Sequence, residues 1–321
     1  MNSLGKSFRC LAKYSTLIIA LNATLSHADS IQVPSTIAAK AHKSLLVNSF
    51  TTGERIFAVG GRGHILYSDN QGESWVQANS PTQMLLTSLY FIDEKNGWAV
   101  GHDSIILRTT DSGENWNILF EAPDLEKPLL DVVFLDANNG LVTGAYGLIM
   151  RTNDGGKTWQ NFMIGELDWH LNSIIQVGTH LFIAGEAGTL VRSSDQGATW
   201  TQLESPYVGS FFGALTTTTD DGDQIIVYGL RGHAFASDDL GNSWTELDTG
   251  VTTNILDGVF TASGDTVFLG AGGTIIRRSK GDTNFEKIPY RGFENLTSVI
   301  AINDSDFVVF GVRGASKLKT Q

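Results

Sequence analysis

Acidic and amide side chains recur beside tryptophans at five places in the chain. Each place follows the pattern Ser/Thr-x-Asp/Asn-x-Gly-x-x-Trp, as in SSDQGATW (193–200). The acidic or amide residues of the five copies are Asn70, Asp111, Asp154, Asp195 and Asp239, and the tryptophans are Trp75, Trp116, Trp159, Trp200 and Trp244. A carboxylate could act as a general acid or base, but five equivalent copies cannot form one active centre. An Asp or Asn that accepts hydrogen bonds from amides of its own turn explains every copy, so we predict a structural role.

Arginine and histidine side chains recur in a second pattern, Gly-x-x-Gly-x-apolar, upstream of the tryptophans. Its third position is arginine in three copies, and a histidine follows two of these arginines by two residues. The residues are Arg62, Arg231, Arg313, His64 and His233. Because a guanidinium group binds a carboxylate through paired hydrogen bonds, we predict that these five residues bind a partner. The alternative is that they are solvated loop residues paired with local acidic side chains.

Other candidate residues favour neither a metal site nor catalysis. His170 and His180 are ten residues apart and have no third ligand at a useful spacing, so we predict no metal and no cofactor. Tyr290 and Glu294 could form a Tyr–Glu nucleophile pair, but nothing in the sequence places them opposite an acid. We therefore expect no catalytic residues and no enzyme activity.

A further set of arginines lies inside predicted strands, seven residues after a recurring glycine. The set is Arg108, Arg151, Arg192 and Arg277. Buried strand positions favour paired charges that hold repeats together, so we favour a structural role between repeats over binding.

The spacing of the Gly-x-x-Gly pattern indicates which elements must position these residues. Its leading glycines are at 60, 101, 144, 185, 229, 270 and 311, which gives a period of 41 to 44 residues. In the fourth unit, four short runs are typical of strands: 171–177, 180–184, 189–193 and 199–203. Seven such units predict an all-β, seven-bladed propeller of four-stranded antiparallel blades. The Gly-x-x-Gly loops would then lie on one face and the tryptophan turns on the other.

The two ends of the predicted ring suggest how it closes. The seventh unit reaches Gln321 before its fourth strand, and a short β-like segment, Ser30–Val33, precedes the first unit. We expect residues 29–43 to complete the last blade and residues 44–321 to form the propeller, because such pairing would cover an exposed sheet edge.

Residues 1–28 have the pattern of a secretory signal peptide. Three basic residues precede the apolar run LIIALNATL (17–25), and Ser26-His27-Ala28 suits cleavage after Ala28. An uncleaved N-terminal helix is the alternative. Cleavage would remove Cys10, the only cysteine, and would leave 19 basic and 34 acidic residues, a net charge of −15. We expect an exported monomer without a membrane span, periplasmic in a Gram-negative host and otherwise secreted. This charge weighs against nucleic-acid or anionic-lipid partners.

The combined patterns resemble the Asp-box (BNR) repeat class, and more closely the photosystem II stability/assembly factor-like family. The resemblance covers about residues 44–321 and includes phrases such as NGWAVG (96–101) and NNGLVTG (138–144). It implies a seven-bladed propeller of a kind found in chloroplasts, cyanobacteria and many non-photosynthetic bacteria. Plastid and cyanobacterial members assist assembly of a membrane complex. We therefore expect a protein partner, bound through an acidic segment or C-terminus, in the assembly or stability of a membrane or envelope complex.

Asp-box repeats also occur in sialidases, so a glycan-binding or glycoside hydrolase function is the alternative. A sialidase would have six blades and an arginine trio, whereas seven units are counted here, and the Arg-Ile-Pro phrase typical of sialidases is missing. Exposed aromatic residues such as Trp98 and Trp169 could stack on sugars, although packing between blades explains them better.

Overall fold

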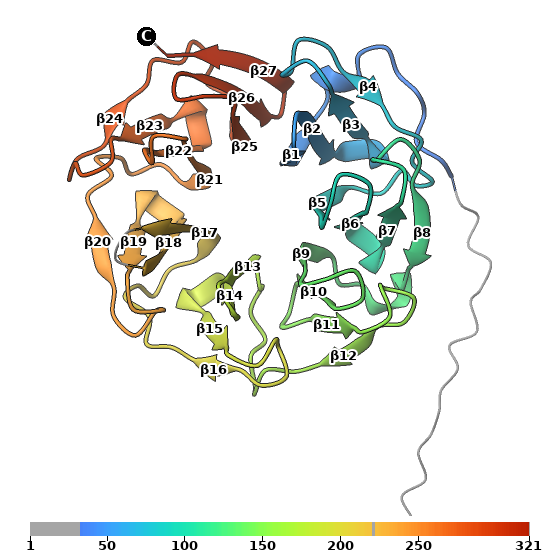
Figure 1. Cartoon of the computed structure of the whole chain (residues 1–321), viewed down its shortest axis with the longest axis horizontal. Coiled ribbons are helices and arrows are strands. Elements are labelled where there is room, and N and C mark those ends of the chain that lie inside the picture. The colour runs from blue at the N-terminus through green and yellow to red at the C-terminus, as the bar shows by residue number, and fades with distance from the viewer. Residues whose placement is uncertain (1–32, 220–221, 321) are drawn as a thin grey trace, which may run out of the picture. The chain divides into compact units, whose positions relative to one another are not determined.

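The chain forms a ring of β-sheets (Figure 1), and residues of the inner strands line a cavity at its centre, the central channel. The computed structural model describes residues 33–219 and 222–320. Helical structure in these residues is confined to seven 3₁₀ turns of three residues each: η1 (Ala41–Lys43), η2 (Gly61–Gly63), η3 (His102–Ser104), η4 (Pro123–Leu125), η5 (Glu186–Gly188), η6 (Leu230–Gly232) and η7 (Ala271–Gly273). Within these ranges, no helix has the length and apolar character needed to cross a membrane.

Seven sheets make up the ring, and each sheet is one blade of consecutive antiparallel strands. Blade one is β1 (Leu46–Thr52), β2 (Arg55–Gly60), β3 (Ile65–Ser68) and β4 (Val76–Gln77). Blade two is β5 (Leu86–Phe91), β6 (Gly97–Gly101), β7 (Ile106–Thr109) and β8 (Asn117–Phe120). Blade three is β9 (Leu129–Phe134), β10 (Gly140–Gly144), β11 (Ile149–Thr152) and β12 (Gln160–Phe162). Blade four is β13 (Ser173–Val177), β14 (His180–Ala184), β15 (Leu190–Ser193) and β16 (Thr201–Gln202).

The remaining blades continue the same order. Blade five is β17 (Phe211–Thr219), β18 (Gly222–Gly229), β19 (Ala234–Ser237) and β20 (Thr245–Leu247). Blade six is β21 (Ile255–Phe260), β22 (Thr266–Gly270), β23 (Ile275–Arg278) and β24 (Glu286–Lys287). Blade seven has three strands among the described residues: β25 (Leu296–Ala301), β26 (Asp306–Gly311) and β27 (Gly314–Lys319). The predicted seven-bladed, all-β propeller is confirmed.

Asp195 shows how the tryptophan pattern builds its turn. Its Oδ1 accepts hydrogen bonds from Ser193 Oγ and the Thr199 amide, both at 2.8 Å. The Ser193 hydroxyl in turn accepts the Gly197 amide at 2.8 Å, and Gly197 has a φ of 84°, which favours glycine. Trp200 Nε1 donates to the Gly197 carbonyl at 3.2 Å. These contacts are local, and we call this segment the repeat turn in each of its five copies.

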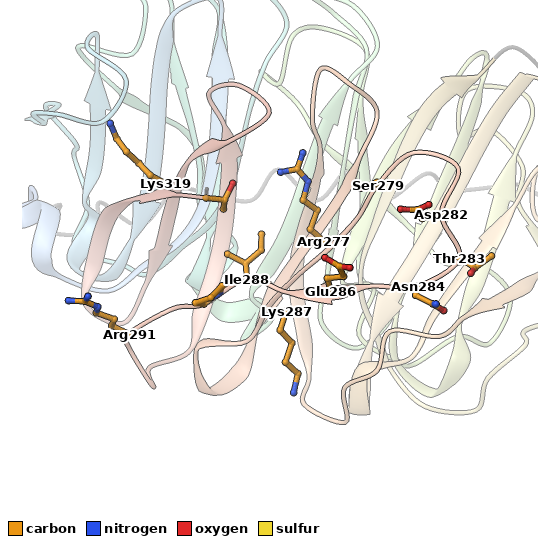
Figure 2. A pocket seen from close by; sticks show the side chains of 12 residues that line it. Arg277, Ser279, Asp282, Thr283, Asn284, Glu286, Lys287, Ile288, Arg291 and Lys319 are labelled. Atoms are coloured by element: carbon orange, nitrogen blue, oxygen red, sulfur yellow. The ribbon is translucent and has the colours of Figure 1, made fainter.

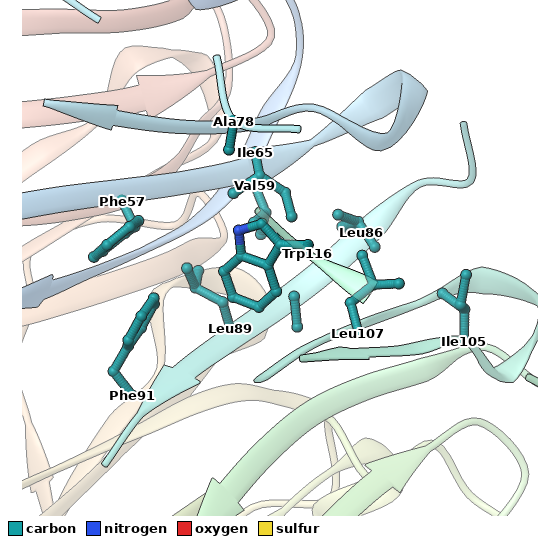
Figure 3. Packing of buried hydrophobic residues seen from close by; sticks show 11 residues of the cluster. Phe57, Val59, Ile65, Ala78, Leu86, Leu89, Phe91, Ile105, Leu107 and Trp116 are labelled. Atoms are coloured by element: carbon teal, nitrogen blue, oxygen red, sulfur yellow. The ribbon is translucent and has the colours of Figure 1, made fainter. Parts of the chain in front are cut away.

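The tryptophan of a repeat turn packs against the preceding blade. Trp116 of blade two lies in one cluster with Phe57, Val59 and Ile65 of blade one (Figure 3). A Cβ atom on Gly113 would overlap the Phe57 ring, so the glycine also lets the turn approach its neighbour. The repeat turn therefore sets the geometry within a blade and the distance between blades.

Strand arginines add hydrogen bonds between blades, as predicted for Arg108 and Arg192. Arg108 Nη1 donates to the Gly155 carbonyl at 3.1 Å, and Arg192 Nη1 to the Leu240 carbonyl at 2.6 Å, each in the next repeat turn. Arg277 differs because it pairs with Asp265 of its own blade, where its Nε donates at 2.8 Å.

Closure of blade seven by the N-terminal segment stays a prediction, because the described part of that segment, from residue 33, forms no strand. Most of the predicted strand Ser30–Val33 falls in residues 1–32, outside the described residues. The Ser35 amide donates to the Ser80 carbonyl at 3.0 Å, and the Ala38 amide to Gln77 Oε1 at 2.9 Å, so residues 35–38 lie along blade one. The hydrogen bond to the Gln77 side chain holds the backbone of residues 35–38 beside β4. Blade one also meets blade seven directly, where Thr297 Oγ1 donates to the Leu46 carbonyl at 2.6 Å.

Candidate functional site

One face of the ring carries the Gly-x-x-Gly turns together with the connections between blades. Because the strands alternate in direction, the turns between second and third strands share this face with the segments that lead from each outer strand to the next inner strand. The Gly61 amide donates to the Leu45 carbonyl at 3.0 Å, and the Ala271 amide to the Asn254 carbonyl at 2.9 Å. A Cβ atom on Gly60 would overlap the Leu45 carbonyl, which explains the leading glycine. We call this side the loop face.

The three predicted arginines lie on the loop face with exposed side chains, on blades one, five and seven. Arg62 and Arg231 occupy left-handed positions, with φ of 60° and 58°. Arg313 lies in a two-residue hairpin between Gly311 and Gly314, a turn one residue shorter than those of the other arginines. Among the described residues, no carboxylate forms a salt bridge with any of these three guanidinium groups. The charge of Arg313 nevertheless lies near enough to Glu294 to help lower the pKa of that carboxyl, so the alternative of local pairing stays open for this arginine.

His64 does not belong to the exposed site that the sequence predicted. Its side chain is buried, with 3% of the residue exposed, and its Nδ1 lies 2.8 Å from Ser44 Oγ. Burial lowers the pKa of His64, and the nearby Arg62 charge lowers it further. The imidazole of His64 therefore supports the segment just before β1 from inside the protein, and it cannot contact a partner at the surface.

His233, in contrast, lies beside Arg231 at a surface cavity of about 540 Å³. Its Nδ1 lies 2.9 Å from Glu246 Oε1, and its ring centroid lies 4.3 Å from that of Tyr207. Asp248 also lines the cavity, so it presents both charge signs. The structure brings together Arg231 and His233 from the predicted set.

Exposed apolar side chains cluster in the segments of the loop face, and sequence reasoning missed most of them. Val208 is 90% exposed and Phe293 is 89% exposed, both in connections between blades. Other exposed apolar residues in these segments are Met84, Leu125, Tyr146, Met163, Trp169 and Val312. The sequence did place these apolar residues in loops between short strands. Because a loop residue is seldom packed in the core, this position could have predicted their exposure. Only Trp169 was singled out beforehand for stacking, and it is 52% exposed.

Trp98 and Trp169 have different environments. Trp98 is fully buried and stacks on Phe134, with ring centroids 3.5 Å apart, so packing between blades accounts for it. Near Trp169, the Lys127 ammonium donates to the Tyr146 carbonyl at 3.1 Å, and the Tyr146 ring meets His170 edge-on at 4.9 Å. These contacts hold the exposed Tyr146 ring in place at the boundary of blades three and four.

Two aspartates on inner strands bind neighbouring blades together, and the sequence reasoning did not identify them. Asp131 and Asp257 occupy the same register position, just after an irregularity in β9 and β21. Asp131 accepts Ser88 Oγ of blade two at 2.7 Å and the Ile174 amide of blade four at 2.8 Å. Both line the central channel, a cavity of about 780 Å³. Burial raises the pKa of each carboxyl, and that of Asp257 is about 6.

The Tyr290–Glu294 pair is present but has the wrong electrostatics for a nucleophile. Tyr290 Oη donates to Glu294 Oε1 at 3.0 Å. Burial raises the pKa of Tyr290, and the hydrogen bond to Glu294 raises it further, so the phenol stays protonated. Glu294 Oε2 also accepts the Phe293 amide at 3.0 Å and thereby braces its own loop. Across the described ranges, no group of three His, Cys, Asp or Glu side chains could hold a metal ion.

Comparison with known proteins agrees with this geometry. Residues 18–110 and 120–207 match the family described as Photosynthesis system II assembly factor YCF48, and the two segments make up more than half of the chain. The chain belongs to the YCF48 family. The family resemblance predicted from the repeats is therefore confirmed. No curated protein matches the sequence.

Solved structures share the propeller fold at low sequence identity. A structure of YCF48 bound to D1 peptide is 18% identical, covers 88% of this chain and 95% of its own, and has a TM-score of 0.69. YCF48 from Cyanidioschyzon merolae is 18% identical, with coverage of 90% and 98% and a TM-score of 0.70. The WD40 β-propeller domain of Doa1 is 12% identical, with coverage of 90% and 96% and a TM-score of 0.69. At such identities, the likeness of YCF48-family and WD40 propellers concerns the fold.

Proposed function

We propose that this YCF48-family protein is an exported, non-catalytic propeller that binds an acidic segment or C-terminus of a partner protein. Binding would serve the assembly or stability of a membrane or envelope complex. Family membership supports a role in assembly, and the related YCF48 that was solved bound to D1 peptide supports a protein ligand.

The observation that carries the proposal is the composition of the loop face. Its exposed arginines have no ion-pair partner among the described residues, and its loops expose Val208, Phe293 and Trp169. Arginine and aromatic residues contribute most of the binding energy in many protein interfaces. A carboxylate-bearing segment would satisfy the guanidinium groups while its apolar side chains cover the exposed ones.

The net charge of the chain makes these arginines selective. The chain carries a net charge of −12, so its surface as a whole repels acidic partners. Three unpaired guanidinium groups on one face would then offer an acidic segment a local site of attraction. The expected ligand is an acidic peptide end or loop rather than a polyanion, because a polyanion would meet the acidic remainder of the ring.

Export is proposed from residues 1–28 alone. Their basic start, apolar run and small residues before position 29 suit a cleaved signal, and cleavage would place the propeller in the periplasm of a Gram-negative host. Fractionation of cells that express the tagged chain, with mass spectrometry of its N-terminus, tests this step. A cytoplasmic chain that retains residues 1–28 would contradict export.

Crosslinking tests the binding function as a whole. The exported protein is crosslinked in isolated envelope membranes, captured, and its partners are identified by mass spectrometry. We expect one defined membrane or envelope complex, with crosslinks that map to the loop face. Enrichment of polysaccharide, or crosslinks confined to the face with the repeat turns, would overturn the proposal.

A further inference from the structure

Among the described residues, the outer edge of blade seven is unpaired. In the other six blades a short fourth strand covers the third strand, whereas among the described residues β27 has a neighbour on one side only, β26. An uncovered edge presents backbone amide and carbonyl groups to which an extended chain can add as a further strand. The site lies on the outer rim of the ring, and its Arg291 end reaches the connection between β24 and β25.

A groove of about 880 Å³ runs beside this edge (Figure 2). We call it the rim groove, and it is lined by Glu286, Lys287, Ile288, Arg291, Lys319 and Thr320 among others. One wall is β24 of blade six with the residues that follow it, and the other is the end of β27.

The boundary of blades one and two shows what occupies the corresponding place elsewhere. There the Asn79 amide donates to the Glu114 carbonyl at 2.9 Å, and the Trp116 amide to the Asn79 carbonyl at 3.0 Å, where the fourth strand of blade two begins. Ala78 and Ile288 are equivalent, since their amides donate to the Ile65 and Ile275 carbonyls, both at 2.9 Å. Pro289 therefore corresponds to Asn79, and it lines the rim groove. The groove is the place where a fourth strand of blade seven would begin.

The side chains of β27 also differ from those of a covered third strand. Ser316 pairs with Val309 as Leu107 pairs with Ala99, so the two residues are equivalent. Leu107 is fully buried in the cluster that contains Trp116, whereas Ser316 is exposed. Blade seven has no tryptophan at this place among the described residues, and the phenol of Tyr290, which follows β24, forms a side-chain hydrogen bond with Ser316 there.

Charge distinguishes the possible occupants of this edge. Lys287, Arg291 and Lys319 line the groove, and Asp282 lies at its opposite end from Lys319 (Figure 2). Lys317, the other lysine of β27, is held by Glu73 of blade one. A second copy of β27 would bring like charges together, which disfavours pairing of two copies. An acidic strand would instead meet cations at the Lys319 end.

We propose that the rim groove binds an acidic, extended segment of a partner protein, which adds to β27 as the fourth strand of blade seven. An apolar side chain of that segment packs against Ile288 in the groove, and its acidic residues lie near Lys319 and Arg291. This site does not include the three arginines of the loop face and does not depend on the function proposed for them.

A peptide copied from this chain supplies the probe. Residues 111–120, DSGENWNILF, hold two acidic residues and Trp116, and they lead into the fourth strand of blade two. We expect the fluorescein-labelled peptide to bind the full chain saturably in fluorescence anisotropy and to protect the β27 amides from hydrogen exchange. The double variant K319E/R291E should weaken binding at least tenfold. The matched double variant K95E/K157E changes two lysines of other blades on the face with the repeat turns, and it should not weaken binding.

Peptide chemistry separates strand addition from simple charge attraction. A version of the peptide that is N-methylated at alternate residues keeps its charge but loses backbone donors, and it should not bind. Equal binding of the methylated peptide, or no saturable binding, would overturn the proposal. Loss of binding in R62Q/R231Q/R313Q instead of K319E/R291E would place the peptide on the loop face. A dimer in sedimentation that the peptide dissociates would identify a second copy of this chain as the occupant, and binding only after removal of residues 29–32 would identify the N-terminal segment of the same chain; either result would overturn the proposal.

Discussion

The hydroxyl of Ser298 donates a hydrogen bond to Asp257 Oδ2 at 2.7 Å across the boundary between blades six and seven. The Val299 amide donates to the same oxygen at 2.9 Å, and Tyr228 of blade five donates to Oδ1 at 3.2 Å. One carboxylate therefore joins three consecutive blades. Burial raises its pKa from 3.8 to about 6, although these hydrogen bonds oppose the rise.

This carboxyl predicts a loss of stability as the pH rises toward neutrality. Because its pKa is higher in the folded chain, the folded state holds the proton more tightly, and the stabilisation present below pH 3.8 is lost as the pH rises through about 6. Linkage limits the effect to about 3 kcal/mol, less where channel water reaches the carboxyl. We expect the thermal unfolding temperature to decrease as the pH is raised from 4.5 to 7, roughly the window of these pKa values. The decrease should be smaller in Asp257→Asn.

Asp131 serves as the internal comparison for this prediction. Burial raises its pKa in the same direction, so the double variant D131N/D257N should flatten the pH dependence further than D257N alone. At the acidic end the sign reverses, since turn hydrogen bonds lower the pKa of Asp195 to about 2 and stability should fall below pH 4. A pH profile of D131N/D257N that matches the wild-type profile between pH 4.5 and 7, roughly the same window, would refute the assignment.

The repeat turn should respond to substitution as a structural element. Asp195→Ala removes the acceptor of the Thr199 amide, the Thr199 hydroxyl and the Ser193 hydroxyl. We expect urea unfolding to show a clearly lower free energy of unfolding, because three donors of the turn lose their acceptor. Glu166→Ala, at an exposed loop residue, serves as the control and should change it by less than about 0.5 kcal/mol. A folded D195A with unchanged stability but no partner capture would assign this residue to binding instead.

The fold was predictable from the sequence because its determinants are local. A hydroxyl, a carboxylate and a glycine within five residues, as in 193–197, define a turn wherever the chain places them, so their spacing counts the blades. Asp131 and Asp257 were not predictable in the same way, because their partners lie on other blades. The shorter hairpin at Arg313 could not be predicted either. Its Gly-x-x-Gly sequence matches the one at Arg62, although the strand register differs. The path of residues 35–38 depends on a side chain of blade one, Gln77, that no repeat pattern reveals.

No glycosidase activity is expected. The phenol of Tyr290 stays protonated at neutral pH because burial and Glu294 raise its pKa. The four aspartates of the repeat turns are committed to their own turns through hydrogen bonds from serine or threonine hydroxyls. Assays of the purified protein with aryl sialosides, aryl glucosides and xyloglucan should give no turnover above buffer. Turnover that disappears in Tyr290→Phe would show the prediction to be wrong.

The exposed apolar residues of the loop face should affect binding without affecting stability. Val208 and Phe293 are 90% and 89% exposed, so V208S/F293S removes little buried area. We expect a change of less than about 0.5 kcal/mol in the free energy of unfolding but clearly weaker capture of the crosslinked partner. The control is V76S, at an exposed residue of β4 on the outer rim. Equal loss of capture in V76S would mean that general surface hydrophobicity causes the effect.

The arginines of the loop face carry the last prediction. The third position of the Gly-x-x-Gly turn is Arg62, Arg231 and Arg313 in three blades but Ala187 or Gly272 in others, so the turn itself does not need arginine. The triple variant R62Q/R231Q/R313Q should therefore fold normally. It should capture the partner at least tenfold less well, because each charge-assisted contact contributes about 1.5–3 kcal/mol when shielded from water and less when exposed.

Salt and a matched variant decide whether this loss is specific to the loop face. Wild-type capture should weaken as ionic strength rises, since salt screens exposed guanidinium–carboxylate pairs, and the triple variant should be nearly insensitive to salt. The control K95Q/K157Q/K280Q removes the same charge from exposed lysines on the face with the repeat turns. It should capture the partner as the wild type does. If R62Q/R231Q/R313Q captures its partner at low salt as well as the wild type does, the arginines are not the binding site.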